Sequence, residues 1–275
     1  MKRRAQPWLG TLVDISIAGT SSEPDLNDVF TQAFAQIATV HRLMSFHASD
    51  SDVTRINRAA VGSTIEIDPH TMKVLELALA LASASASVFN ICCASQLVRW
   101  ALLPSNETEL PAFDGGTCAL RIVDAVSVSK TRPVMIDLGG IAKGYAVDQA
   151  IAALHHAGVV SACVNAGGDL RVLGETPFPI TIRHPQAITQ AGAELELANA
   201  ALATSATYFS RRSVGGVSVS ALVDGRNGAA ITSERSVSVI APSCMVADAL
   251  TKIVLASGNA NHALLADFEA SAFII

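Results

Sequence analysis

The stretch MIDLGGIAKGYAVDQA, Met135–Ala150, decides how the middle of the chain is expected to fold. Apolar residues surround Asp137, which predicts the end of a buried strand, and apolar residues after the glycines recur at helical spacing. Gly139 and Gly140 stand at the junction, where the backbone can approach a ligand. Lys143 follows one turn into the helix. A strand, a glycine turn and a helix start with a lysine indicate a site for anionic groups such as phosphates.

This stretch also fits a simpler interpretation, in which Asp137 only caps an ordinary helix. NAGGDL, residues 165–170, also allows two interpretations. Its glycines either let main-chain N–H groups face a ligand or form a plain hairpin turn. ATSATYFSRR, residues 203–212, offers hydroxyls and the guanidinium groups of Arg211 and Arg212, which suit phosphate. It fits equally a strand edge with solvated arginines.

ADALTK, residues 247–252, places Asp248 and Thr251 one helical turn apart on a shared face. A carboxylate and a hydroxyl are oxygen ligands of the kind that Mg²⁺ accepts, with phosphate oxygens completing its octahedron. Taken alone, the segment is also an ordinary helix with a polar stripe.

Composition bounds the class of protein. The 275 residues are 50% hydrophobic, which predicts one domain over residues 1–275 or two intimately packed lobes. The net charge of −5 leaves no basic footprint for nucleic acid. The sequence contains no run of about 18 apolar residues, so we expect no membrane span.

The N-terminus lacks an apolar signal region and a lipid-accepting cysteine, which predicts a cytoplasmic protein, or a periplasmic one if a leader has been removed. The five cysteines are scattered, which favours core residues over disulfides or a zinc site.

Helical spacing predicts long helices over residues 26–46, 70–90, 146–158 and 244–258. Short strands with turn signals dominate between residues 159 and 241. Helices first and strands later predict an α+β fold with mixed or antiparallel sheets and packed helices.

Taken in chain order, several segments together resemble the ApbE family almost from end to end. They include WLGTLVDIS, FNICCASQLVRWALLP, DLGGIAKGYAVDQA, NAGGDL, LVDGRNG and ADALTK. The pair DLGGIAKGYAVD and NAGGDL is the specific part. The resemblance implies a T-fold-like ApbE architecture that binds FAD between a helical region and a mixed sheet. It implies a Mg²⁺-dependent FAD:protein FMN transferase, which cleaves the pyrophosphate of FAD, moves FMN to a Ser/Thr hydroxyl of a flavoprotein partner and releases AMP.

The resemblance also assigns roles to residues. It implies nucleotide contacts at Leu9, Phe89, Asn90, Asp137, Lys143 and Leu222. It implies that Mg²⁺ binds the Gly140 carbonyl, Asp248 and Thr251, and that Asp248 and Lys143 are the catalytic residues. Two alternatives stay open: hydrolysis of FAD to FMN and AMP, and a non-catalytic relative that binds flavin.

The chain departs from the family pattern at several positions. Asn90 stands for an aspartate, Ala206 for a glycine, Ala221 for a histidine, Gly225 for a proline and Lys252 for a metal-ligating threonine. Because an ammonium cannot ligate Mg²⁺, either Thr251 serves from the adjacent face of the helix or Lys252 partly replaces the cation.

Overall fold

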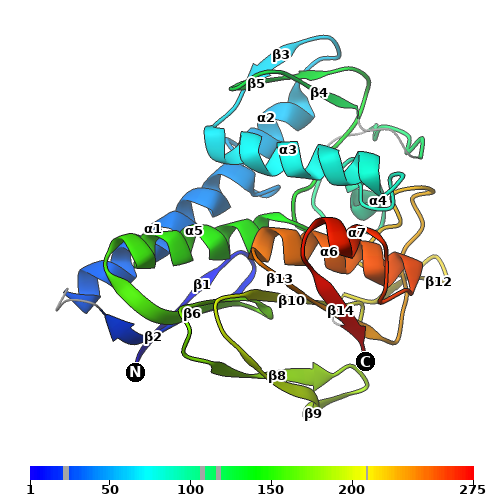
Figure 1. Ribbon diagram of the computed structural model, residues 1–275. Helices are drawn as coiled ribbons and strands as arrows, with labels where there is room; N and C mark the ends of the chain where they lie inside the picture. The colour runs from blue at the N-terminus through cyan, green and yellow to red at the C-terminus, as the bar shows by residue number, and fades with distance from the viewer. Residues whose placement is uncertain (21–24, 106–108, 116–118, 209) are drawn as a thin grey trace. The chain divides into compact units, whose positions relative to one another are not determined.

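A computed structural model describes residues 1–20, 25–105, 109–115, 119–208 and 210–275, which form two compact units (Figure 1). The first unit comprises Met1–His41, Ile141–Ala206 and Glu234–Ile275. The second unit comprises Arg42–Gly140 and Thr207–Ser233. The second unit therefore consists of two segments inserted into the chain of the first.

The first unit is built on a seven-stranded sheet in the order β1-β2-β6-β7-β10-β13-β14. Every neighbouring pair of strands is antiparallel. The strands are β1 (Lys2–Trp8), β2 (Thr11–Thr20), β6 (Val159–Ala166), β7 (Asp169–Leu173), β10 (Ala201–Ala206), β13 (Ser236–Ala241) and β14 (Ser271–Ile274). The predicted α+β class with antiparallel pairing is confirmed.

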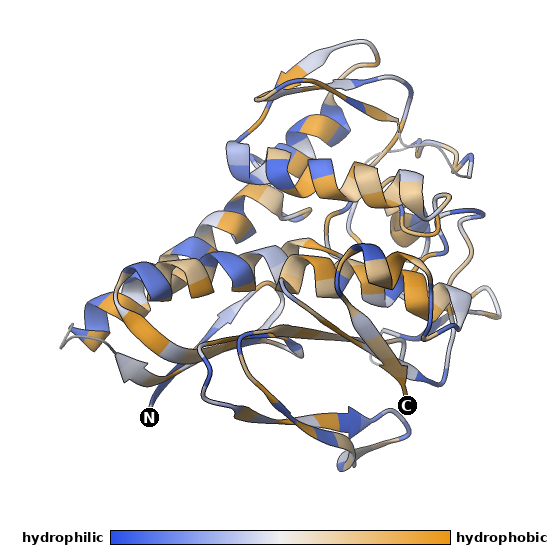
Figure 2. Cartoon of the chain, in the orientation of Figure 1, coloured by the Kyte–Doolittle hydropathy of each residue, from blue (hydrophilic) through white to orange (hydrophobic). Residues whose placement is uncertain are grey.

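The helices of the first unit are α1 (Leu26–Met44), which ends in the second unit, α5 (Ala142–His156), α6 (Cys244–Ser257) and α7 (Leu264–Asp267). Helix α5 packs on β6 and β7, and α6 packs on β10 and β13. Figure 2 shows α6 as mostly apolar, in keeping with its many buried residues. The helices expected over residues 146–158 and 244–258 are confirmed.

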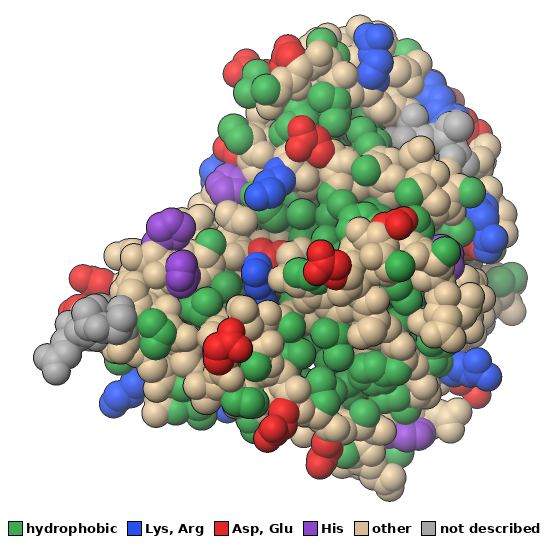
Figure 3. Space-filling model, viewed as in Figure 1, with side chains coloured by type: hydrophobic (Ala, Val, Ile, Leu, Met, Phe, Trp, Pro, Cys, Tyr) green, Lys and Arg blue, Asp and Glu red, His purple; other side chains and the backbone are tan. Residues whose placement is uncertain are grey.

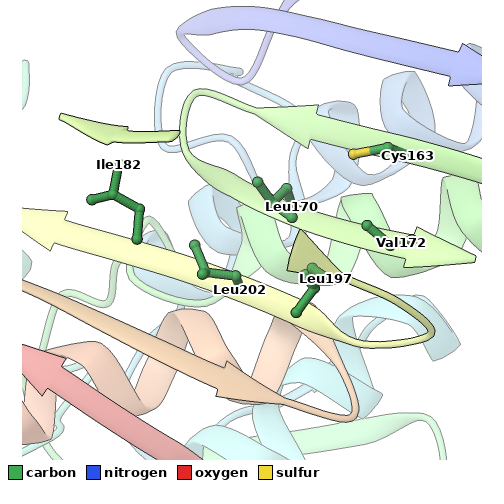
Figure 4. Close-up of a cluster of buried hydrophobic side chains, with 6 residues drawn as sticks. All are labelled: Cys163, Leu170, Val172, Ile182, Leu197 and Leu202. Atoms are coloured by element: carbon green, nitrogen blue, oxygen red, sulfur yellow. The ribbon is translucent and has the colours of Figure 1, made fainter. Parts of the chain in front are cut away.

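A hairpin of β8 (Phe178–His184) and β9 (Ala187–Leu197) lies on the sheet face away from α5 and α6 (Figure 1). With side chains of β6, β7 and β10 it encloses a buried cluster, drawn in Figure 4: Cys163, Leu170, Val172, Ile182, Leu197 and Leu202. Partly buried apolar residues such as Phe178 and Phe273 continue this cluster to the surface. Figure 3 shows hydrophobic side chains gathered over β8 and β14.

The second unit contains a three-stranded sheet in the order β3-β5-β4 and a β11–β12 hairpin. Its elements are α2 (Asp52–Arg58), β3 (Thr64–Glu66), α3 (Pro69–Ala84), α4 (Ala94–Arg99), β4 (Leu120–Asp124), β5 (Ser127–Lys130), β11 (Arg212–Val214) and β12 (Val217–Val219). The helix predicted over 70–90 ends earlier, at Ala84, because Ala86 and Ser87 take left-handed φ values of 47° and 65°. No helix among the described ranges is both long and apolar enough to cross a membrane.

The strand predicted before the Gly139–Gly140 turn is absent. Residues 134–138 belong to no strand, and the Asn57 side chain bonds backbone groups that a neighbouring strand would otherwise bond. Its amide accepts from the Ile136 N–H at 2.7 Å and donates to the Ile136 carbonyl at 3.0 Å. The Asp137 N–H bonds to the Ile91 carbonyl at 2.9 Å. The apolar pattern correctly predicted burial, but it could not distinguish a ladder from a side-chain amide that satisfies the same backbone groups.

Helices α5 and α6 approach each other closely at Gly144. A Cβ atom added there would lie well inside 3.0 Å of the Cys244 carbonyl oxygen and close to the Met245 Cα. Backbone cannot move aside as a flexible side chain can. The glycine is therefore what allows α6 to pass against the first turn of α5.

We expect Gly144→Ala to lower the free energy of unfolding by about 1–3 kcal/mol, because the methyl group overpacks a backbone contact. Urea denaturation followed by circular dichroism measures the change. Gly19→Ala is the control, since a Cβ there meets Ser161 and Val160 only at an ordinary 3.5 Å. Equal stability of Gly144→Ala and wild type would contradict the close approach.

Candidate functional site

The first turns of α5 and α6 meet, and each receives a carboxylate from the other helix. Asp248 of α6 accepts a hydrogen bond from the Gly144 N–H of α5 at 3.1 Å. In return, the two carboxylate oxygens of Asp148 on α5 accept from the N–H groups of Cys244 and Met245, each at 2.9 Å. The first amides of a helix lack intrahelical partners and carry partial positive charge, so both carboxylates are stabilised. This exchange fixes Asp248 beside the start of α5.

A lysine–carboxylate cluster forms at this junction, from Lys143, Asp169, Asp248 and Lys252. The Lys143 ammonium pairs with Asp169 and lies 3.6 Å from Asp248 Oδ2. The Lys252 ammonium pairs with Asp248 Oδ1. The side chains of Asp169 and Asp248 are 4% and 0% exposed, whereas those of Lys143 and Lys252 are 30% and 13% exposed. The cluster thus buries its carboxylates, whereas its lysine side chains stay partly exposed.

The charges in this cluster set one another's protonation. Burial lowers the pKa of Lys143, but the neighbouring Asp169 and Asp248 more than offset this and raise the pKa above its ordinary value. Burial raises the pKa of Asp248, but Lys143 and Lys252 outweigh it and leave the pKa below its ordinary value. Burial and the charge of Asp248 raise the pKa of Asp169. The Lys143 side chain therefore stays protonated at neutral pH.

Asp169 enters the cluster from the NAGGDL segment. This segment forms the tight turn between β6 and β7, as the plain-hairpin interpretation has it, and Asp169 is the first residue of β7. Two residues later, Arg171 reaches Asp148 at 2.7 Å and holds the carboxylate that caps α6. Sequence reasoning assigned no role to Asp169, Arg171 or Asp148. The only signal for them was an aspartate directly after a glycine pair.

Thr251 is fully buried, and its hydroxyl is engaged within the first unit. Its hydroxyl donates to the Asp248 carbonyl at 2.6 Å and shares a hydrogen bond of 2.7 Å with Ser205 on β10. The hydroxyl therefore ties α6 to the sheet.

The residues present do not fit the expected Mg²⁺ site. Asp248 already has Lys252 on one oxygen, and the Gly144 amide and Lys143 on the other. Thr251 uses its hydroxyl inside the fold. Gly140, the third expected ligand, directly precedes Ile141 at the N-cap of α5. Within the described part of the chain, no three His, Cys, Asp or Glu side chains are grouped as metal ligands. Mg²⁺ at these residues stays a prediction from resemblance that their geometry does not favour.

Asp137 does not cap α5. It is half-buried, and its carboxylate accepts from the Gly139 N–H at 3.1 Å. The residue at the N-cap of α5 is Ile141, whose side chain caps nothing. Burial, together with the negative charge of Asp137, raises the pKa of the Cys93 thiol to about 12.

Three other expected nucleotide contacts also lie in the second unit. Phe89 is buried, and Leu222 is half-buried. Asn90 accepts from the Cys92 N–H at 2.9 Å and donates to the Gly225 carbonyl at 3.4 Å. The amide thus joins the Phe89–Asn90 segment to the loop that carries Leu222, and it has a structural task whether or not it meets a ligand.

The residues expected from resemblance are divided between the two units. Leu9, Lys143, Asp248 and Thr251 belong to the first unit, and Phe89, Asn90, Asp137, Gly140 and Leu222 to the second. Leu9 begins the two-residue turn between β1 and β2, with a left-handed φ of 55°. Lys143, Asp248 and Thr251 are brought together in the first unit. In the second unit, the Asp137 N–H bonds to the Ile91 carbonyl and Asn90 bonds to the Gly225 carbonyl, which brings Phe89, Asn90 and Asp137 near the loop that carries Leu222.

The arginines of ATSATYFSRR serve the backbone of the second unit. Arg211 donates to the Ser233 carbonyl at 2.9 Å, and Arg212 to the Ala101 carbonyl at 2.8 Å.

The described cysteines, Cys92, Cys93, Cys163 and Cys244, form no disulfides, in agreement with the sequence analysis. Cys118 lies outside the described residues.

Comparison with known proteins adds independent findings. The chain matches the model of the ApbE family over residues 9–274. It is 28% identical to an FAD:protein FMN transferase of Rhodobacter capsulatus over 265 residues, covering 91% of this chain and 50% of that protein. It is 25% identical over 268 residues to an FAD:protein FMN transferase of Vibrio cholerae, covering 92% of this chain and 80% of that protein. The chain thus spans about half the length of the Rhodobacter relative.

Solved structures share the fold. The ApbE protein of Thermotoga maritima superimposes with a TM-score of 0.86 at 24% identity, over 100% of this chain and 94% of that one. The flavin transferase ApbE of Vibrio cholerae gives 0.82 at 24% identity, over 100% and 93%. These likenesses confirm the α+β architecture expected from the sequence.

Asp148→Asn tests the carboxylate exchange between the helices. We expect it to lower the free energy of unfolding by about 1–3 kcal/mol, since one charged acceptor serves two helix-terminal amides. Arg171→Met is the matched comparison and should cost under about 1 kcal/mol, because it removes only a partly exposed ion pair. Chemical denaturation measures both variants. Equal losses would mean that Asp148 acts through Arg171 alone.

Cys93 should resist alkylation at neutral pH. Its raised pKa of about 12 keeps the thiol protonated, so the reactive thiolate gains population only as the pH rises toward that value. Iodoacetamide labelling with peptide mass spectrometry, in a series from pH 7 to pH 10, measures the rate. Asp137→Asn should accelerate labelling modestly, since burial is the larger cause. Rapid labelling of Cys93 in the wild type at pH 7 would contradict the raised pKa of this thiol.

Proposed function

The chain belongs to the ApbE family, and on that premise we propose that it is an FAD:protein FMN transferase. The named relatives carry this activity, and the lysine–carboxylate cluster is the observation in this chain that supports it most. In the cluster, two partly exposed lysine side chains pair with two buried carboxylates. A dinucleotide offers such ammonium groups the negative charge of its diphosphate.

In the proposed reaction, a Ser/Thr hydroxyl oxygen of a flavoprotein partner attacks the phosphorus on the FMN side of the diphosphate. A new P–O bond joins FMN to the partner, and the bond between phosphorus and the bridging oxygen breaks. AMP leaves with that oxygen, and the hydroxyl proton passes to solvent. Such transfer depends mainly on charge neutralisation and alignment of the hydroxyl.

We assign Lys143 to neutralise charge that develops on the diphosphate. Asp248 holds Lys143 and the first turn of α5 in place, through the contacts at 3.6 Å and 3.1 Å. Leu9, Phe89, Asn90, Asp137 and Leu222 are proposed as flavin-nucleotide contacts on the strength of the family pattern. Mg²⁺ would supply further charge neutralisation in a family member that binds it. Because Asp248 and Thr251 do not fit it here, no step is assigned to a metal.

Two alternatives rest on specific features. Hydrolysis of FAD to FMN and AMP differs only in that water replaces the partner hydroxyl. A non-catalytic flavin binder is favoured by the internal use of Asn90 and by Lys252 at the expected metal-ligand position.

The deciding experiment incubates the protein with FAD, with and without a flavoprotein acceptor, and separates FMN, AMP and labelled acceptor by mass. Transfer predicts AMP release that depends on the acceptor, with a mass increase on the acceptor. Lys143→Met should lower kcat/KM by about 100-fold, the effect of losing one charge-stabilising donor. Lys73→Met removes an exposed lysine of α3 and should leave the rate unchanged.

Other outcomes separate the alternatives. AMP release without acceptor indicates hydrolysis. Bound flavin with no AMP in either mixture indicates a non-catalytic binder and contradicts the proposed transfer. Equal rates for Lys143→Met and Lys73→Met would remove Lys143 from the reaction.

A further inference from the structure

Helix α6 holds its own cation against the carboxylate of Asp248. Lys252 follows Asp248 by one turn, the spacing and order in which a carboxylate and an ammonium pair best on a helix. The Lys252 ammonium contacts Asp248 Oδ1 and also donates to the Asp248 carbonyl at 2.8 Å. Asp248 is fully buried, so this is a closed internal pair. The ammonium is held by two oxygens of the residue that a metal would need.

The second oxygen of Asp248 is also engaged. Oδ2 accepts from the Gly144 N–H at 3.1 Å and lies 3.6 Å from the Lys143 ammonium. A divalent ion at Asp248 would have to displace a lysine and then remain beside two ammonium groups. Mg²⁺ also requires several oxygen ligands at short distances in octahedral geometry.

Among the described residues, the side-chain oxygens of Thr251 and Asp169 beside Asp248 are already engaged. The Thr251 hydroxyl is used by the Asp248 carbonyl and by Ser205, and the Asp169 carboxylate is paired with Lys143. The formal charges of the two carboxylates and the two lysines cancel within the cluster. The buried carboxylates therefore need no additional cation.

We infer, first, that Lys252 is the cation of this site and, second, that it excludes divalent ions from Asp248. Third, we infer that an anionic diphosphate binds to the ammonium groups of Lys143 and Lys252 without a metal ion. The first two statements concern the protein without ligand. The third rests on the proposed function.

Mn²⁺ titration monitored by electron paramagnetic resonance tests the exclusion, because free and protein-bound Mn²⁺ give different signals. Wild type should leave Mn²⁺ free through the millimolar range, whereas Lys252→Thr should bind one ion at least 10-fold more tightly, on the order of one ligand's effect on metal affinity. Lys252→Met removes the ammonium without supplying an oxygen and should bind more weakly than Lys252→Thr. Thermal unfolding of each variant establishes that it is folded, and Lys252→Gln replaces Lys252→Thr if the latter is not.

Wild-type binding of Mn²⁺ that Asp248→Asn abolishes would overturn the inference. So would folded Lys252→Thr with no gain in Mn²⁺ affinity.

FAD titration by calorimetry in EDTA and in Mg²⁺ tests the third statement. Wild type should bind FAD with affinities that agree within about 2-fold in the two buffers, since a metal-independent site gains nothing from the ion. Lys252→Thr should require Mg²⁺ for comparable affinity. A wild type that binds FAD only with Mg²⁺ would overturn the inference. Absence of FAD binding in both buffers would instead refute the proposed function and this third statement. The Mn²⁺ titration would still test whether Lys252 excludes divalent ions from Asp248.

Discussion

The contact between α5 and α6 at Gly144 is the constraint on which the site depends. Because residue 144 lacks a side chain, the first turn of α6 can lie against the first turn of α5. Each helix then places a carboxylate on the other's unpaired amides, Asp248 on Gly144 and Asp148 on Cys244 and Met245. Packing and capping thus reinforce each other, because neither carboxylate could reach its amides across a wider gap.

The charge arrangement follows from this contact. Asp248 is fully buried because the helix crossing covers it, and a buried carboxylate must be paired. Lys143 and Lys252 provide the pairing, and Asp169 on β7 balances Lys143 from the sheet. The lysine side chains keep an exposed fraction that the carboxylates lack. In the proposed function, a chain with a net charge of −5 meets the diphosphate with these lysines.

Much of this organisation could be predicted from the sequence, but not its long-range partners. The helix after Gly139–Gly140, the final helix and the antiparallel strands followed from periodicity. The sequence analysis left open whether Lys252 partly replaces a cation, and the structure pairs it with Asp248. Asp148 could not be assigned because the amides that it caps lie 96 and 97 residues further along the chain. The false strand before Gly139 arose because Asn57, 79 residues earlier, satisfies backbone groups that otherwise imply a ladder.

The central claim is that the chain's own ammonium groups, rather than a divalent ion, face the diphosphate of FAD. A crystal structure of the protein grown with FAD and Mn²⁺, with anomalous diffraction data, tests it most directly. The account predicts diphosphate oxygens within hydrogen-bond distance of the Lys143 ammonium and no anomalous peak at Asp248. An anomalous peak on the Asp248 carboxylate, or a diphosphate bound away from Lys143, would contradict it.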